Sequence, residues 1–159
     1  MINPANDMPN STPKPRTDTL AVAEGLRPVL LRINRELRRE TRAGGASPEQ
    51  VSLLVAVKYA PGIGVRELAA RERISAAAMS KHVDRLERDG LVTRTPSEAD
   101  RRRVGLTLTD EGRRILRRVR SRRTAWLVSR LDELSPEEIA AVEAAVGPLS
   151  RLLHDGDGR

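Results

Sequence analysis

The feature of the sequence that most constrains the fold is a change of hydrophobic period at Gly90. Before it, Met79, Val83 and Leu86 recur at spacings of four and three residues, which is typical of the buried stripe of one helix. After it, apolar residues alternate with polar or small ones in two short runs within residues 91–109, which is typical of two paired strands. The sequence therefore predicts a helix followed directly by a β-hairpin.

The residues at both ends of this helix are typical helix-capping residues. Ser75 is a suitable N-cap, because its hydroxyl can accept a hydrogen bond from a first-turn backbone N–H. Gly90 stands where a helix needs a left-handed residue to end. We expect Asp84 to form an ion pair with Arg85 or Arg88 on the exposed face of the helix. The residues of that face are Ala77, Ser80, Lys81, Asp84, Arg85 and Arg88.

The hairpin has a basic tip, and a second helix precedes the first. Residues 98–103 join the two strands and contain three consecutive arginines. Upstream, Val65, Leu68 and Ala69 form the apolar face of a short helix, and residues 71–74 supply a turn into the next one. Two short helices followed by a basic hairpin are typical of a winged helix-turn-helix.

The spacing of these residues supports a family resemblance. From Gly62 to Gly112 the chain follows the pattern G-x-x-x-x-x-L-A-x-x-x-x-I-S-x-x-x-M-S-x-x-V-D-R-L-E-x-x-G-L-V, then D-R-R, then L-T-L-T-x-x-G. In these positions it resembles the MarR family of bacterial transcriptional regulators. It departs from the family at Glu72, where an apolar residue is usual, and at Arg73, where glycine is usual. The turn between the two helices can therefore differ in geometry. The alanines at 76–78 also replace more polar residues.

The charge of the chain indicates a polyanionic partner. Its 159 residues are expected to form one domain with a shared core. The net charge is +7, and residues 94–123 alone contain 11 arginines and 4 acidic residues, which accounts for all of it. A nucleic-acid-binding face explains this concentration better than general solubility does.

Composition excludes several other classes of protein. The absence of cysteine excludes disulfides and thiol redox chemistry, and no apolar run is long enough for a membrane span, so we expect a cytoplasmic protein. One Trp and one Tyr are too few for RNA binding by base stacking. We find no P-loop, no HExxH motif, no catalytic triad and no clustered metal ligands, and therefore expect neither an enzyme nor a cofactor or metal.

The expected architecture is mainly α-helical with a small β-hairpin wing, in one domain at residues 19–154. A disordered tail at residues 1–18 and a frayed C-terminus at residues 155–159 flank it. The winged helix-turn-helix core occupies about residues 47–109. The remaining helices carry more apolar surface than such a core can cover, so they are expected to form a dimerisation region, at about residues 19–42 and 110–154.

The resemblance implies how DNA is bound. The helix at residues 75–89 is expected in the major groove, and the hairpin tip in the minor groove. Asp100 matches a family acidic residue that orients an arginine, so we expect Arg102 in the minor groove and Arg101 held by Asp100. The opposite assignment of the two arginines is a close alternative. The expected DNA-contacting residues are Ser75, Ala77, Ser80, Lys81, Arg85, Arg94, Thr95, Asp100, Arg101, Arg102 and Arg103.

The resemblance also implies a homodimeric repressor that binds a pseudo-palindromic operator in double-stranded DNA and is released by a small lipophilic or phenolic effector. Arg27, Tyr59 and Trp126 could line a cleft for that effector, although each needs no ligand to explain it. The arginines of the helix that begins at Asp110 are interpreted mostly as a solvated face. The alternative function is a non-specific architectural protein of double-stranded DNA, which the alanine run at 76–78 and the arginine surplus favour.

Overall fold

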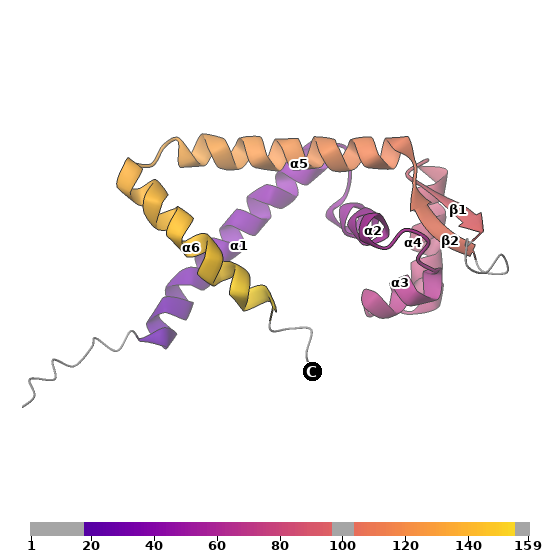
Figure 1. The fold of residues 1–159 in the computed structure, drawn as a ribbon, viewed down its shortest axis with the longest axis horizontal. Coiled ribbons are helices and arrows are strands. Elements are labelled where there is room, and N and C mark those ends of the chain that lie inside the picture. The colour runs from indigo at the N-terminus through magenta and orange to yellow at the C-terminus, as the bar shows by residue number, and fades with distance from the viewer. Residues whose placement is uncertain (1–17, 97–103, 155–159) are drawn as a thin grey trace, which may run out of the picture. The chain divides into compact units, whose positions relative to one another are not determined.

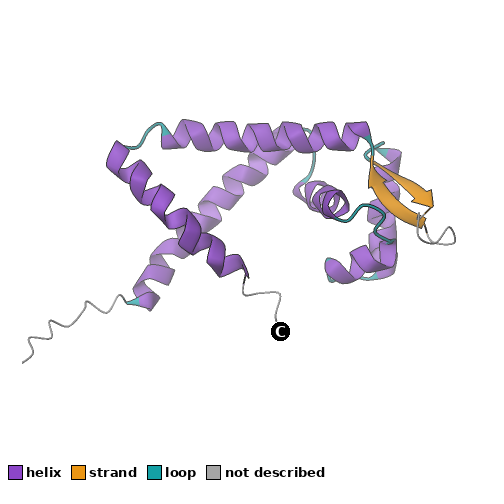
Figure 2. Ribbon diagram, viewed as in Figure 1, coloured by secondary structure: helices purple, strands orange, loops and turns teal. Residues whose placement is uncertain are grey.

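The computed structural model describes residues 18–96 and 104–154. Its described part consists of six helices and one two-stranded antiparallel sheet, which confirms the predicted fold class (Figures 1 and 2). The chain divides into two compact units, one ending at Arg35 and the other beginning at Glu36. The elements are α1 (Thr19–Ala43), α2 (Pro48–Tyr59), α3 (Val65–Arg71), α4 (Ala76–Arg88), β1 (Val92–Pro96), β2 (Val104–Leu108), α5 (Asp110–Leu131) and α6 (Pro136–His154).

Side-chain caps set where α2, α4 and α5 begin. Ser47 accepts a hydrogen bond from the backbone N–H of Gln50 at 3.1 Å, and the Gln50 side chain accepts one from the Ser47 backbone N–H at 2.8 Å. Ser75 and Thr109 cap α4 and α5 in the same way, each accepting from the N–H three residues later. The predicted N-cap at Ser75 is therefore confirmed. Such a cap typically contributes about 1 kcal/mol.

The core lies where α2, α3, α4, the hairpin and the N-terminal half of α5 meet. The predicted stripe of α4 is confirmed, because its three side chains are at most 1% exposed. Burying one such side chain typically contributes about 1.5–3 kcal/mol. The face of α4 that remains outside is thereby fixed. The large side chains buried most completely are Leu54, Leu68, Met79, Val83, Leu86 and Leu106.

The hairpin is bonded to the turn before α3 through its second strand. Its strands pair from Val92 with Leu108 to Pro96 with Val104. The backbone of Leu106 also pairs with the turn before α3, donating to the Ile63 carbonyl at 3.0 Å. This bonding fixes the base of the wing against the helix-turn-helix.

Glycine allows α5 to begin directly against the end of α4. Gly90 turns the chain with a φ of +70°, a left-handed value that favours glycine. A Cβ at Gly112 would lie 2.1 Å from the backbone oxygen of Leu91, a distance that no side chain can adopt. The Thr109 hydroxyl completes the junction by donating to the Gly90 carbonyl at 2.6 Å. None of the described helices has the length and apolarity needed to cross a bilayer.

The turn between α3 and α4 contains a left-handed arginine. Arg73 has a φ of +55°, and no other non-glycine residue among those described has a positive φ. The N–H groups of Arg73 and Ile74 donate to the carbonyls of Ala70 and Ala69, which closes the end of α3. The departure from glycine at this position thus leaves a strained backbone at the centre of the helix-turn-helix.

Replacing Arg73 tests this strain. Arg73→Gly removes a backbone cost of about 1–2 kcal/mol but increases the freedom of the unfolded chain, so we expect a gain in stability of up to about 1 kcal/mol. This gain corresponds to a melting temperature about 2–4 °C higher. Arg73→Val places a β-branched residue at the same φ and is expected to lose at least about 1 kcal/mol. Thermal unfolding followed by circular dichroism measures both variants, and an Arg73→Val protein as stable as the wild type would contradict the assignment.

Candidate nucleic-acid interface

The exposed face of α4 carries most of the predicted groove-reading residues. Ala77, Lys81 and Arg85 are exposed, whereas Ser80 is half-buried. Within the part of the chain that the structure describes, no carboxylate pairs with Lys81 or Arg85, so both cations are available to acceptors on another molecule. Ser75 is exposed, and its oxygen accepts the capping hydrogen bond from Ala78.

Arg94 connects the wing to α4. From β1 its guanidinium donates to Asp84 at 2.8 Å and to Glu87 at 2.5 Å, both on α4. The hydrogen bond to Asp84 raises the pKa of the Arg94 guanidinium, so this side chain stays charged. The expected pairing of Asp84 with Arg85 or Arg88 is wrong, because the hairpin brings Arg94 beside Asp84.

This pairing gives Arg94 a position that the sequence did not reveal. Asp84 and Glu87 each accept one hydrogen bond from the Arg94 guanidinium, which has five N–H donors, and the expected contact of Arg94 with phosphate stays a prediction. Arg88 donates its Nε to the backbone carbonyl of Asp84 within its own helix. Thr95 is half-buried on β1, opposite Gly105 in the strand register.

The tip of the wing lies outside the described residues. The last pair of the hairpin is Pro96 with Val104, so residues 97–103 form the connection beyond it. The predicted contacts there stay predictions. They are Asp100, Arg101, Arg102 and Arg103.

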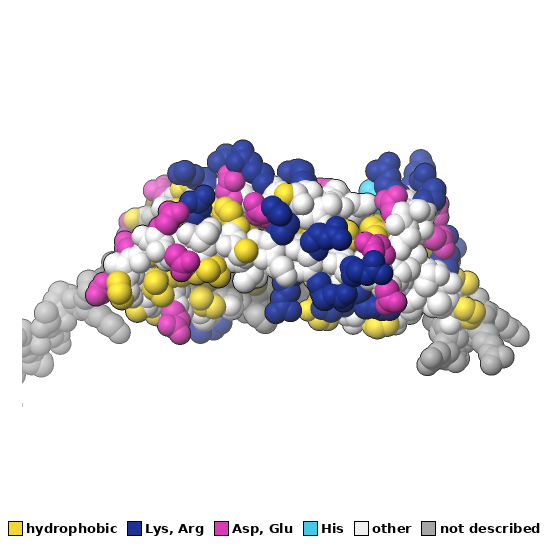
Figure 3. Space-filling view, turned by 90° about the horizontal axis from the view of Figure 1, so that it is seen from above, with side chains coloured by type: hydrophobic (Ala, Val, Ile, Leu, Met, Phe, Trp, Pro, Cys, Tyr) yellow, Lys and Arg dark blue, Asp and Glu magenta, His cyan; other side chains and the backbone are white. Residues whose placement is uncertain are grey.

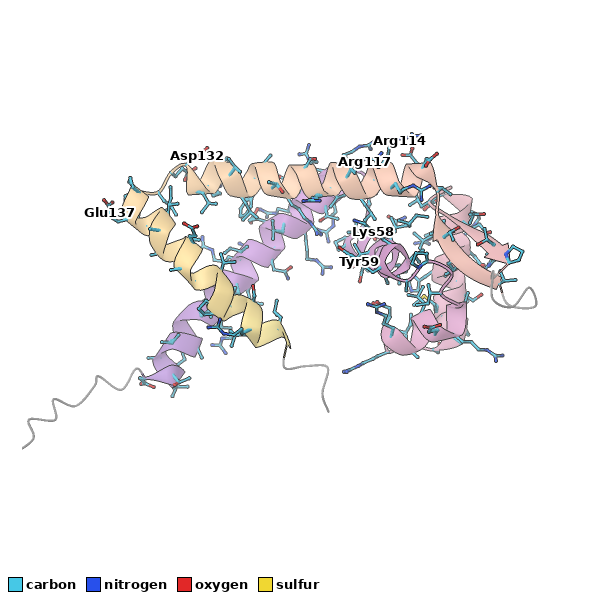
Figure 4. The ribbon with its side chains drawn as sticks, viewed as in Figure 1. Lys58, Tyr59, Arg114, Arg117, Asp132 and Glu137 are labelled. Atoms are coloured by element: carbon cyan, nitrogen blue, oxygen red, sulfur yellow. The ribbon has the colours of Figure 1, made fainter. Side chains whose placement is uncertain are left out.

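A cavity of about 470 Å³ lies between α2, α5 and the end of α1. Tyr59 lines it, as the sequence analysis suggested for an effector cleft, and Figure 4 labels Tyr59 beside Lys58 on α2. Trp126 is half-buried on α5 and is not part of the lining, whereas Arg27 belongs to the first unit. The lining residues are Leu37, Val51, Val55, Lys58, Tyr59, Leu116, Val119, Arg120, Arg123, Thr124 and Leu127.

This lining combines apolar side chains with cations. Lys58, Arg120 and Arg123 contribute positive charge, and none of the described carboxylates lines the cavity. Arg123 is held in place because its Nε and Nη2 atoms donate to the Thr41 hydroxyl at 2.9 and 2.7 Å. The cavity therefore suits an apolar molecule that carries negative charge. Among the described residues there is no group of His, Cys, Asp or Glu that could hold a metal ion.

Comparison with known proteins agrees with this geometry. The model of the MarR family matches residues 46–104. The HTH-type transcriptional repressor MdtR of Bacillus subtilis is 32% identical over 114 residues, which are 72% of this chain and 74% of that protein. A transcriptional regulator protein from Pseudomonas aeruginosa PA01, known from its crystal structure, is 33% identical with a TM-score of 0.75, covering 88% of this chain and 99% of that one.

A third similar protein was solved with DNA. It is a mutant of MepR from S. aureus bound to an oligodeoxyribonucleotide, 18% identical to this chain with a TM-score of 0.66. The match covers 84% of this chain and 98% of that one. At this identity the likeness shows that the fold is shared.

Replacing Arg94 tests whether the wing has to be held by α4. Arg94→Met removes both ion pairs, and we expect it to lower duplex affinity about tenfold, or about 1.4 kcal/mol, because the wing loses its fixed orientation. Exposed ion pairs contribute about 0–1 kcal/mol each, so the protein should remain folded. Arg88→Met removes the same charge but no contact between wing and helix, and serves as the control in fluorescence anisotropy. Equal losses for the two variants would mean that charge alone matters.

Proposed function

The chain belongs to the MarR family of DNA-binding transcriptional regulators, and we propose that it acts as a homodimeric repressor of a pseudo-palindromic operator. The observation that carries this proposal is that α4 is amphipathic, with one buried apolar face and one exposed cationic face. Its apolar stripe is buried, while Lys81 and Arg85 point away from the core without carboxylate partners among the described residues. A helix presented in this way can enter the major groove.

In the proposed complex α4 reads the major groove sparsely. Lys81 and Arg85 can donate to guanine acceptors or to phosphate, and Ser80 to a base edge or phosphate. Ala77 offers a methyl contact suited to thymine. The N-terminal turn of α4 otherwise presents alanines, so DNA shape contributes more to specificity than in a helix rich in amides.

The wing would supply the minor-groove contact. We propose that Arg102 enters the groove and that Asp100 orients Arg101, with Arg103 and Thr95 beside the phosphates. The charge concentration in residues 94–123 supports this assignment. Arginine is suited to a narrow minor groove, where the negative potential is strongest.

A second copy of the chain would cover the apolar surface of α6. Five of its large apolar side chains are exposed, from Ile139 at 40% to Leu153 at 82%. The first unit, on α1, likewise exposes Leu20 and Leu31 by more than half. Such faces on a soluble regulator are normally buried in a symmetric interface, and two lobes are what a pseudo-palindromic operator requires.

The cavity between α2 and α5 is the proposed effector site. Its apolar lining with Tyr59 and three cations supports a lipophilic or phenolic molecule with a negative charge. Such a ligand releases DNA if it binds more tightly to a conformation in which the two lobes no longer match the half-sites. Tyr59 is 72% exposed in the described unit, so it can close over the ligand.

A non-specific architectural protein is the alternative function, and gel-shift assays separate the two. The proposed repressor binds DNA upstream of its own gene about 1,000-fold more tightly than a random duplex. Arg102→Ala lowers that preference, whereas Arg101→Ala has a smaller effect. An affinity for upstream DNA equal to that for random duplex would favour the architectural function.

The proposed dimer can be tested on α6. Val146 is 57% exposed, so Val146→Glu is expected to leave each chain folded while placing a charge in the interface between copies. Sedimentation equilibrium should then give a two-chain mass for the wild type and a one-chain mass for the variant. Glu143→Gln, a neutral change on the same helix, should keep the two-chain mass. A one-chain mass for the wild type would contradict the dimer.

A further inference from the structure

A second cavity, of about 250 Å³, lies between α2 and α5 and is lined almost entirely by cations. Its residues are Lys58, Arg113, Leu116, Arg117 and Arg120. Within residues 18–96 and 104–154 no carboxylate lines it, and the side chains of Lys58, Arg117 and Arg120 are exposed. In the space-filling view dark-blue Lys and Arg side chains gather over the surface that carries α5 (Figure 3).

Most of this charge is not neutralised within the described part of the chain. Arg113 pairs with Asp110 at 2.9 Å and donates to the Leu108 carbonyl. For Arg117 and Arg120 the described residues provide no carboxylate partner. Lys58 likewise has none there, and its Nζ lies 5.3 Å from the centroid of the Tyr59 ring.

The cations that line this cavity lie close enough together to repel one another electrostatically. Arg113, Arg117 and Arg120 follow one another at spacings of four and three, which places them on one side of α5. Like charges at such spacings destabilise a helix, and Lys58 adds a further positive charge from α2 (Figure 4). An anion bound among them would offset this repulsion, and arginine binds the oxygens of phosphate with paired, charge-assisted hydrogen bonds.

The cationic cavity adjoins the proposed effector cavity. The two share Lys58, Leu116 and Arg120. Beyond the shared residues, one cavity continues into apolar surface that includes Val55 and Leu127, and the other continues to Arg117. Because the two cavities share side chains, they offer neighbouring apolar and cationic surfaces to one ligand.

We infer that this site binds a small molecule in which an apolar group is joined to one or more phosphates. The apolar group occupies the cavity beside Tyr59, and the phosphates lie between Lys58, Arg117 and Arg120. This inference rests on the proposed effector function and adds the chemical class of the ligand. DNA phosphate is a less suitable occupant, because the lining comes from α2 and α5 and includes no residue of α3, α4, β1 or β2.

The test compares two ligands with the same apolar body. Geranyl diphosphate carries the phosphates, and geranic acid carries one carboxylate in their place. Isothermal titration calorimetry at fixed salt measures both on the wild type, on Arg117→Gln and on Arg118→Gln. Arg117 lines the cationic cavity but not the effector cavity, whereas Arg118, its exposed neighbour on α5, lines neither. Both variants lose one positive charge, so they differ only in whether the lost charge belongs to the cavity.

The wild type is expected to bind geranyl diphosphate about tenfold or more tightly than geranic acid, since several charge-assisted hydrogen bonds are added. Arg117→Gln should remove most of that advantage without changing the affinity for geranic acid, and Arg118→Gln should keep it.

Four results would overturn the inference. Equal affinity of the wild type for the two ligands would leave the effector cavity in place without its phosphate-binding extension. Equal losses in the two variants would indicate unspecific attraction by charge. A tenfold loss of duplex affinity in Arg117→Gln, with geranyl diphosphate binding unchanged, would make the arginines DNA contacts. If neither ligand bound, both the extension and the effector cavity would be contradicted for ligands of this class.

Discussion

The burial of one face of α4 is the constraint on which the rest of this structure depends. Met79, Val83 and Leu86 are inserted into a core built by α2, α3, the hairpin and α5, and each is at most 1% exposed. Rotating α4 about its axis would expose these side chains at a cost of about 1.5–3 kcal/mol each. The helix therefore has one favourable orientation. Its apolar face has to stay buried, so the opposite face, with Lys81 and Arg85, lies on the surface.

The wing shares this rigidity through two sets of contacts. Backbone hydrogen bonds between Ile63 and Leu106 hold β2 against the turn before α3, and Arg94 holds β1 against Asp84 and Glu87 of α4. The individual ion pairs contribute little to stability, because they are partly exposed. Their effect is geometric, since they fix the direction of the hairpin relative to the helix. A DNA-binding protein that contacts adjacent major and minor grooves at once needs this fixed relation.

The sequence predicted what depends on local pattern and missed what depends on tertiary placement. The helix, its N-cap at Ser75 and the two strands followed from periodicity and capping chemistry. The partner of Asp84 did not, because only the folded hairpin brings Arg94 beside it. Neither did the cationic cavity, because Lys58 and Arg117 are 59 positions apart in the chain and belong to helices whose packing no short pattern encodes. In the sequence the arginines of α5 were therefore interpreted as a solvated face.

These contacts fix α4 and the base of the wing relative to each other, and in the proposed dimer two such units are held at a fixed separation on the DNA. Hydroxyl-radical footprinting on the upstream DNA measures that separation directly. The account predicts two equivalent protected patches centred about one helical turn, roughly 10 bp, apart, each flanked by minor-groove protection. A single protected patch, or uniform weak protection along the duplex, would contradict it.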